Sequence, residues 1–140
     1  MIKAIIFDLD NTLLDFIKMK QFAVKAAITA MIEAGLSVDE EKAYDDIFDL
    51  YMERGWENQQ VFDDYLNQTV GEVSNKILAA GIVSYRRARE ATLLVYPNVN
   101  KTLIQLIKMG INLAVVSDAP SREAWMRLYY LNLHHVLIQS

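Results

Sequence analysis

Apolar residues along this chain follow two different periods, one typical of strands and one typical of helices. Residues 4–7 and residues 113–116 are continuous apolar runs, which is the pattern of a strand buried in a parallel sheet. A shorter run at residues 135–138 predicts a third strand. Between the first two runs, apolar positions recur at helical spacing. The pattern therefore predicts an α/β protein with a parallel sheet.

Four helices are predicted between the two main strand runs. The apolar positions of the first are Met19, Phe22, Ala23, Ala26 and Ala30, with Gly35 as its C-terminal stop. Ser37 followed by Glu40 forms the pattern of a capping box, which predicts a second helix from this point. The third helix is expected over residues 59–70 and the fourth over residues 74–91.

Two further helices are predicted on either side of the second strand run. Asn98 or Asn100 can cap a helix that ends near Met109. Ser121 is the expected N-cap of the helix that follows the second run.

The order of these elements predicts two domains. Residues 1–15 and 95–140 are expected to form a partial Rossmann-like core, whose strand–helix–strand return is right-handed by the usual crossover rule. Residues 16–94 are expected to form an inserted four-helix cap domain. The predicted fold class is therefore an α/β sheet protein with a helical insertion.

Two carboxylates stand at the carboxyl end of the first predicted strand. In open α/β sheets this edge is where ligands bind, so Asp8 and Asp10 are candidates for chemistry. Two like charges held close together favour one ionised and one protonated carboxyl, so Asp8 can attack as a nucleophile while Asp10 donates a proton. Mg²⁺ on the same oxygens would offset the repulsion between a carboxylate and a phosphate. The alternative is that residues 10–12 form only an Asx-type turn.

A hydroxyl and a carboxylate follow the second strand run. If the two strands are neighbours and parallel, Ser117 faces the pocket opened by Asp8. The Ser117 hydroxyl and the backbone amide of Asp118 can both donate to phosphate oxygens, and the start of the next helix favours an anion nearby. The alternative is that Ser117 is an ordinary turn residue at a strand end.

Together these segments resemble the first two motifs of the haloacid dehalogenase superfamily, as Asp8-Leu9-Asp10-Asn11-Thr12 and Val115-Val116-Ser117-Asp118. The resemblance implies that Asp8 is the nucleophile and a Mg²⁺ ligand. It implies that Asp10 is the general acid/base, with its backbone carbonyl on the metal, and that Ser117 binds phosphate. Leu9, Thr12 and Asp118 complete the implied phosphate-binding set. The insertion directly after the first motif resembles the capped subgroup.

The second acid points to phosphoryl transfer, because dehalogenases of this superfamily typically lack it. The chain is similar to archaeal members that act on glyceraldehyde 3-phosphate, which implies a small phosphorylated metabolite as substrate and Mg²⁺ as cofactor. A cap excludes water and contacts the rest of the substrate, and Phe16, Lys18 and Trp56 are the candidates for that contact. The alternatives are core packing for the aromatic residues and an ordinary surface position for Lys18.

The resemblance does not extend to the superfamily's later lysine and last acidic motif. Lys101 and Lys108 precede the second motif and match neither position. In the resembled fold the first strand lies inside the sheet, whereas here it would form an edge, which is prone to pairing. We therefore expect either a fragment of a longer protein or a homo-oligomer formed through this edge. The second functional hypothesis is a catalytically weak or inactive module that binds or self-associates.

Composition narrows the remaining function classes. The chain has 140 residues, of which 53% are hydrophobic, so it can bury a core. A net charge of −4 without a basic face argues against nucleic acid, and the basic residues at 86–89 are expected on a solvated helix face. Zero cysteines exclude disulfides, and no apolar run approaches membrane-spanning length. No signal peptide precedes the first strand, so the cytoplasm is the expected location.

Overall fold

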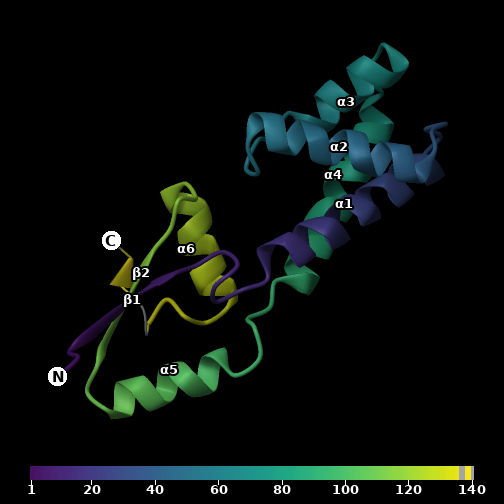
Figure 1. The fold of residues 1–140 in the computed structure, drawn as a ribbon. Coiled ribbons are helices and arrows are strands. Elements are labelled where there is room, and N and C mark those ends of the chain that lie inside the picture. The colour runs from purple at the N-terminus through teal and green to yellow at the C-terminus, as the bar shows by residue number, and fades with distance from the viewer. Residues whose placement is uncertain (136–137, 140) are drawn as a thin grey trace. The chain divides into compact units, whose positions relative to one another are not determined.

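The computed structural model describes residues 1–135 and 138–139 and has the predicted α/β architecture. β1 (Ala4–Asp8), β2 (Asn112–Val116) and β3 (Ile138–Gln139) form a parallel sheet in the order β1-β2-β3 (Figure 1). β3 begins later than predicted, since His135 lies in a turn, and residues 136–137 are outside the described residues. The predicted fold class is confirmed.

Helices account for most of the described chain. No helix among these residues is both long enough and apolar enough to cross a membrane. The helices are α1 (Phe16–Glu33), α2 (Glu40–Arg54), α3 (Val61–Val70), α4 (Asn75–Thr92), α5 (Val99–Lys108) and α6 (Ser121–Tyr130) (Figure 1).

The chain divides into two compact units. The sheet unit contains Met1–Met19 and Thr92–Ser140, and the helical unit contains Lys20–Ala91. The sheet unit carries the three strands with α5 and α6, whereas the helical unit carries α2, α3 and most of α1 and α4. The assignment of the helical unit as a cap domain remains a prediction.

The two faces of the sheet differ in burial. Leu113 and Val115 on β2 are buried, whereas Val116 is 44% exposed and Ile6 on β1 is 68% exposed. Two right-handed crossovers in the same direction, which the usual crossover rule leads us to expect, would place α5 and α6 on one face and account for this difference. The prediction that β1 is a buried strand is therefore wrong for the face that carries Ile6. β1 is an edge strand of the described sheet, and its side chains alternate between less and more exposed positions.

The helical unit has an apolar core to which all four of its helices contribute. The ring of Tyr51 stacks on Tyr85 at 6.5 Å, and Phe62 meets Tyr85 edge-on at 5.5 Å between ring centroids. Phe22 is an exception to the predicted inward positions of α1, since it is 50% exposed. The fully buried members of this core include Ala23, Val24, Ala27, Met31, Ile47, Val61 and Leu66.

A lysine lies inside this core. Lys20 is 3% exposed, and its ammonium group donates to the backbone carbonyl of Trp56 at 2.6 Å and to the Tyr85 hydroxyl at 2.5 Å. The same nitrogen lies 3.8 Å from the centroid of the Tyr51 ring, a cation–π contact. Burial, together with the neighbouring Tyr85, raises the pKa of the Tyr51 phenol, so this ring stays neutral at physiological pH. The buried charge is thus held by polar and aromatic groups from α4 and α2 and the segment after α2.

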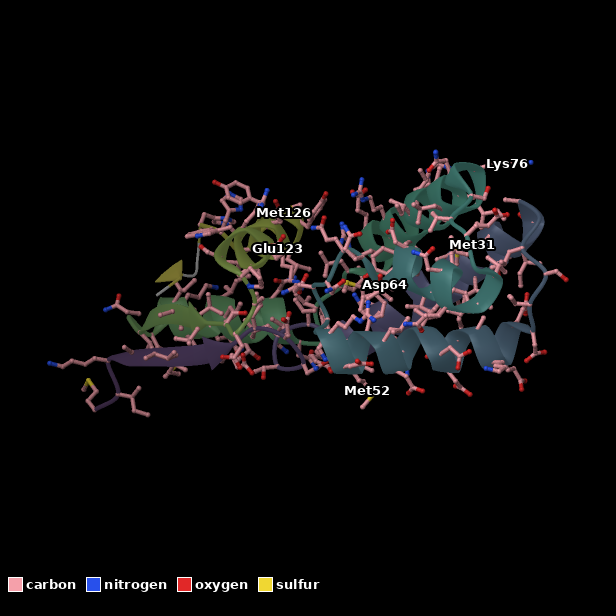
Figure 2. The ribbon with its side chains drawn as sticks, turned by 90° about the horizontal axis from the view of Figure 1, so that it is seen from above. Met31, Met52, Asp64, Lys76, Glu123 and Met126 are labelled. Carbon is pink, nitrogen blue, oxygen red and sulfur yellow. The ribbon has the colours of Figure 1, made fainter. Side chains whose placement is uncertain are left out.

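Ion pairing and helix caps complete the local structure. Arg54 at the end of α2 pairs with Asp64 on α3, which is labelled in Figure 2. The N-cap of α2 is Asp39, whose carboxylate accepts from the Lys42 amide at 3.0 Å, so the predicted capping box at Ser37 is wrong. Both residues suit the cap, but only Asp39 immediately precedes the first helical residue.

The caps of the two helices beside β2 also differ in part from the predictions. Asn98 occupies the N-cap position of α5 with a left-handed φ of 68°, although its side chain makes no capping hydrogen bond. The N-cap of α6 is Pro120, so Ser121 is the first helical residue and not the cap as predicted. The helix therefore begins one residue earlier than a serine N-cap at this position predicts.

Gly81 on α4 yields the first testable prediction. A Cβ atom at Gly81 would lie 2.8 Å from Sδ and 2.9 Å from Cγ of Met31, a fully buried residue of α1 labelled in Figure 2. We expect Gly81→Ala to lower the free energy of unfolding by about 1 kcal/mol, because overpacking outweighs the gain in helix propensity. In the Met31→Ala background the same substitution should stabilise by about 1 kcal/mol. Urea unfolding of the four variants measures both effects, and an equal sign in both backgrounds would contradict this account.

Candidate active site

The register of the sheet brings the two predicted strand ends to one edge. Asp8, the last residue of β1, pairs with Val116, the last residue of β2, and Ser117 follows directly. The Asp8 carboxylate accepts a hydrogen bond from the Leu9 amide at 2.9 Å, and the Ser117 hydroxyl accepts one from the Ala119 amide at 3.1 Å. Asp8 is exposed and Ser117 is half-buried, so a polar pair is accessible at this edge.

The loop after β1 is held by its own backbone. The fully buried Leu9 presents its carbonyl oxygen to the amides of the next turn, including Leu13 at 3.0 Å. Asn11 adopts a left-handed φ of 61°, which asparagine tolerates, and its side chain accepts from the Ile17 amide at the start of α1. Thr12 in this turn is exposed. The loop therefore links β1 to α1 in one defined path.

The segment that follows α4 is hydrogen-bonded to the loop after β1. Val95 forms an antiparallel bridge with Leu14, and the Tyr96 amide donates to the Leu13 carbonyl at 2.9 Å. Burial and the neighbouring Asp15 carboxylate raise the pKa of the Tyr96 phenol. The loop that carries Asp10 is thus restrained from a second, distant part of the chain.

Asp10 pairs with a residue that the sequence analysis did not identify. Nη1 of Arg127, on α6, donates to Oδ2 of Asp10 at 2.9 Å. The side chains are only 8% and 24% exposed, respectively. The available signal was a charged residue among apolar positions, because Arg127 lies on the same stripe of α6 as the buried Ala124 and Leu128.

The predicted substrate-contact residues occupy three different environments. Phe16 is 5% exposed, and its ring centroid lies 4.9 Å from Cζ of Arg127. Lys18 is exposed, while its backbone amide donates to Asp15. Trp56 belongs to the helical unit, where it is half-buried and its carbonyl accepts from Lys20. The structure thus groups Phe16 with Arg127 and Asp10, and Trp56 with the buried lysine.

The remaining predicted residue, Asp118, is exposed and follows Ser117 at the sheet edge. Mg²⁺ takes oxygen ligands, commonly one or two carboxylates together with water and phosphate. The exposed Asp8 carboxylate and the Asp10 backbone carbonyl are donors of that kind, so the chemistry of this edge fits the ion. No three His, Cys, Asp or Glu side chains gather into a metal-binding group within residues 1–135 and 138–139.

Comparison with known proteins identifies the family of this chain. A family model for haloacid dehalogenase-like hydrolases matches residues 2–139. The glyceraldehyde 3-phosphate phosphatase of Methanocaldococcus jannaschii is 35% identical over 134 residues, which cover 96% of this chain and 59% of that protein. The chain spans about 60% of the length of the curated relatives that it matches.

Solved structures share the fold at low sequence identity. A protein from Thermotoga maritima described as a β-phosphoglucomutase aligns with a TM-score of 0.69 at 20% identity, covering 99% of this chain and 61% of that one. A hydrolase from Bacillus subtilis, solved bound to magnesium, aligns with a TM-score of 0.58 at 20% identity, covering 99% and 62%. The predicted superfamily is confirmed: by the family match over nearly its whole length, this chain belongs to the haloacid dehalogenase-like hydrolases.

Proposed function

We propose that this chain is the nucleophile-bearing part of a Mg²⁺-dependent phosphatase that hydrolyses a small phosphate monoester. The observation that carries the proposal is the pairing of Asp8 with Val116, which brings a carboxylate and the Ser117 hydroxyl to one sheet edge. The membership of the chain in a hydrolase family supports it.

The proposed reaction has two displacements at phosphorus. A carboxylate oxygen of Asp8 attacks, a bond from that oxygen to phosphorus forms, and the ester oxygen leaves with a proton from Asp10. Water then attacks the phosphorylated Asp8 while Asp10 takes a proton from it. This step releases inorganic phosphate and restores both carboxyl groups.

The remaining edge residues would bind the phosphoryl group. Ser117 would donate its hydroxyl, Asp118 its backbone amide, and Leu9 and Thr12 would complete the cradle from the loop after β1. Mg²⁺, held by the Asp8 carboxylate and the Asp10 carbonyl, would supply charge neutralisation that lets a carboxylate approach an anionic phosphate. The magnesium in the Bacillus subtilis hydrolase supports this choice of ion.

The proposed substrate is a small phosphorylated metabolite, and the name of the archaeal relatives makes glyceraldehyde 3-phosphate the first compound to test. The helical unit would act as the cap that contacts the rest of the substrate, with Phe16, Lys18 and Trp56 as candidates. The proposed location is the cytoplasm.

Replacement of the proposed nucleophile tests the mechanism. Asp8→Asn should lower turnover of 4-nitrophenyl phosphate by about 10⁴-fold, because an amide cannot form the phosphoryl intermediate. Asp49→Asn, an exposed aspartate on α2, is the matched control and should retain wild-type turnover. Removal of Mg²⁺ with a chelator should abolish turnover, and adding the ion back should restore it. A folded wild-type chain without turnover would favour the inactive binding module instead.

The exposed edge of β1 leads to a third prediction, that the chain self-associates through it. β1 is paired on one side in the described sheet, and Ile6 on it is 68% exposed. Ile6→Lys should shift the chain to monomer, because a lysine on an edge strand opposes strand pairing. Ile104→Lys on α5, which also replaces an exposed isoleucine, should leave the assembly unchanged. Light scattering gives the mass in each case, and a monomeric wild-type chain would refute self-association.

A further inference from the structure

Arg127 joins three parts of the sheet unit that are distant in sequence. Its guanidinium contacts both the carboxylate of Asp10, in the loop after β1, and the ring of Phe16, at the start of α1. Its backbone belongs to the last turn of α6, the helix that follows Ser117. One side chain thus connects the loop of the first motif to the helix of the second.

The environment of this pair is unusual for a stabilising ion pair. The Arg127 side chain is 8% exposed, and Ala124 and Leu128 on the same helix are fully buried. The free energy needed to remove two charges from water cancels much of the attraction between them. A buried ion pair therefore contributes little net stability. Arginine does provide a planar, rigid donor group that fixes the orientation of a carboxylate.

The orientation of Asp10 matters for the proposed chemistry. Asp10 must lie within hydrogen-bond reach of the leaving oxygen when it gives a proton, and of the attacking water when, ionised, it takes one, and a displacement of about 1 Å costs about 10²-fold in rate. Asp10 follows the last residue of β1 by two positions, and its backbone forms only an isolated bridge to Leu14, so its carboxylate lies outside the regular strands of the sheet. The contact from Arg127 is made to Oδ2, one of its two oxygens.

We propose that Arg127 is the positioning residue of Asp10: clamped against Phe16, its guanidinium holds the Asp10 carboxylate in the orientation needed for proton transfer. This inference rests on the proposed phosphatase function. It gives α6 a role in the chemical step, besides its position directly after the proposed phosphate-binding segment at Ser117.

The test compares Arg127→Ala, Arg127→Met and Arg127→Lys in the full chain, with 4-nitrophenyl phosphate and Mg²⁺. Arg127→Met retains an unbranched side chain beside Phe16, so it provides a second variant if Arg127→Ala does not fold. Arg122→Ala, an exposed arginine on the same helix, is the matched control. Thermal unfolding establishes which variants are folded.

For the folded Ala and Met variants we expect kcat to fall by about 10²-fold with KM little changed, since substrate binding is left in place. Arg127→Lys should lie between these variants and the wild type, because lysine keeps the charge without the planar fork. Millimolar guanidinium, but not the same concentration of urea, should restore part of the turnover of Arg127→Ala.

Two results separate the failure of this inference from the failure of the proposed function. If the wild-type chain turns over substrate and Asp8→Asn does not, a folded Arg127→Met with unchanged kcat would overturn the role of Arg127 alone. A loss confined to KM or to thermal stability, without rescue by guanidinium or lysine, would also overturn it. A wild-type chain without turnover would overturn both proposals.

Discussion

The parallel register between β1 and β2 is the constraint on which the candidate site depends. It pairs Asp8 with Val116 and so sets Ser117 beside the end of β1. A slip of one residue would send each side chain of a strand to the opposite face. Burial of Leu113 and Val115 on one face of β2 opposes such a slip, so the packing that stabilises the sheet also sets the geometry of its edge.

Much of the fold could be predicted because its signals are local. Continuous apolar runs located β1 and β2, and helical periodicity located the helices. The caps were harder, because Ser37 and Asp39 are both good N-cap residues and the choice depends on where the helix starts. The exposure of Ile6 could not be predicted, because an apolar run does not show which elements cover each face of a strand.

The residues of the candidate site also differ in whether a local sequence pattern could predict them. The ends of the two apolar runs identified Asp8 and Ser117 as candidates. The register places these two strand ends side by side, as expected. The chemical roles of Asp8 and Ser117 remain predictions. Arg127 stands 117 positions from its partner Asp10, and no local pattern links residues so far apart. Its single signal was a charge on an apolar helix stripe, which becomes interpretable only when the loop after β1 is seen to meet α6.

The bridge between Leu14 and Val95 and the hydrogen bond from Tyr96 to Leu13 affect how the helical insertion can vary in length. The chain leaves the sheet unit and re-enters it at adjoining points, so the intervening helices form an insertion whose two ends lie close together. The entropic cost of closing such an insertion increases only slowly with its length. Helical inserts of different length can therefore be accommodated at this junction while the path of the strands stays the same.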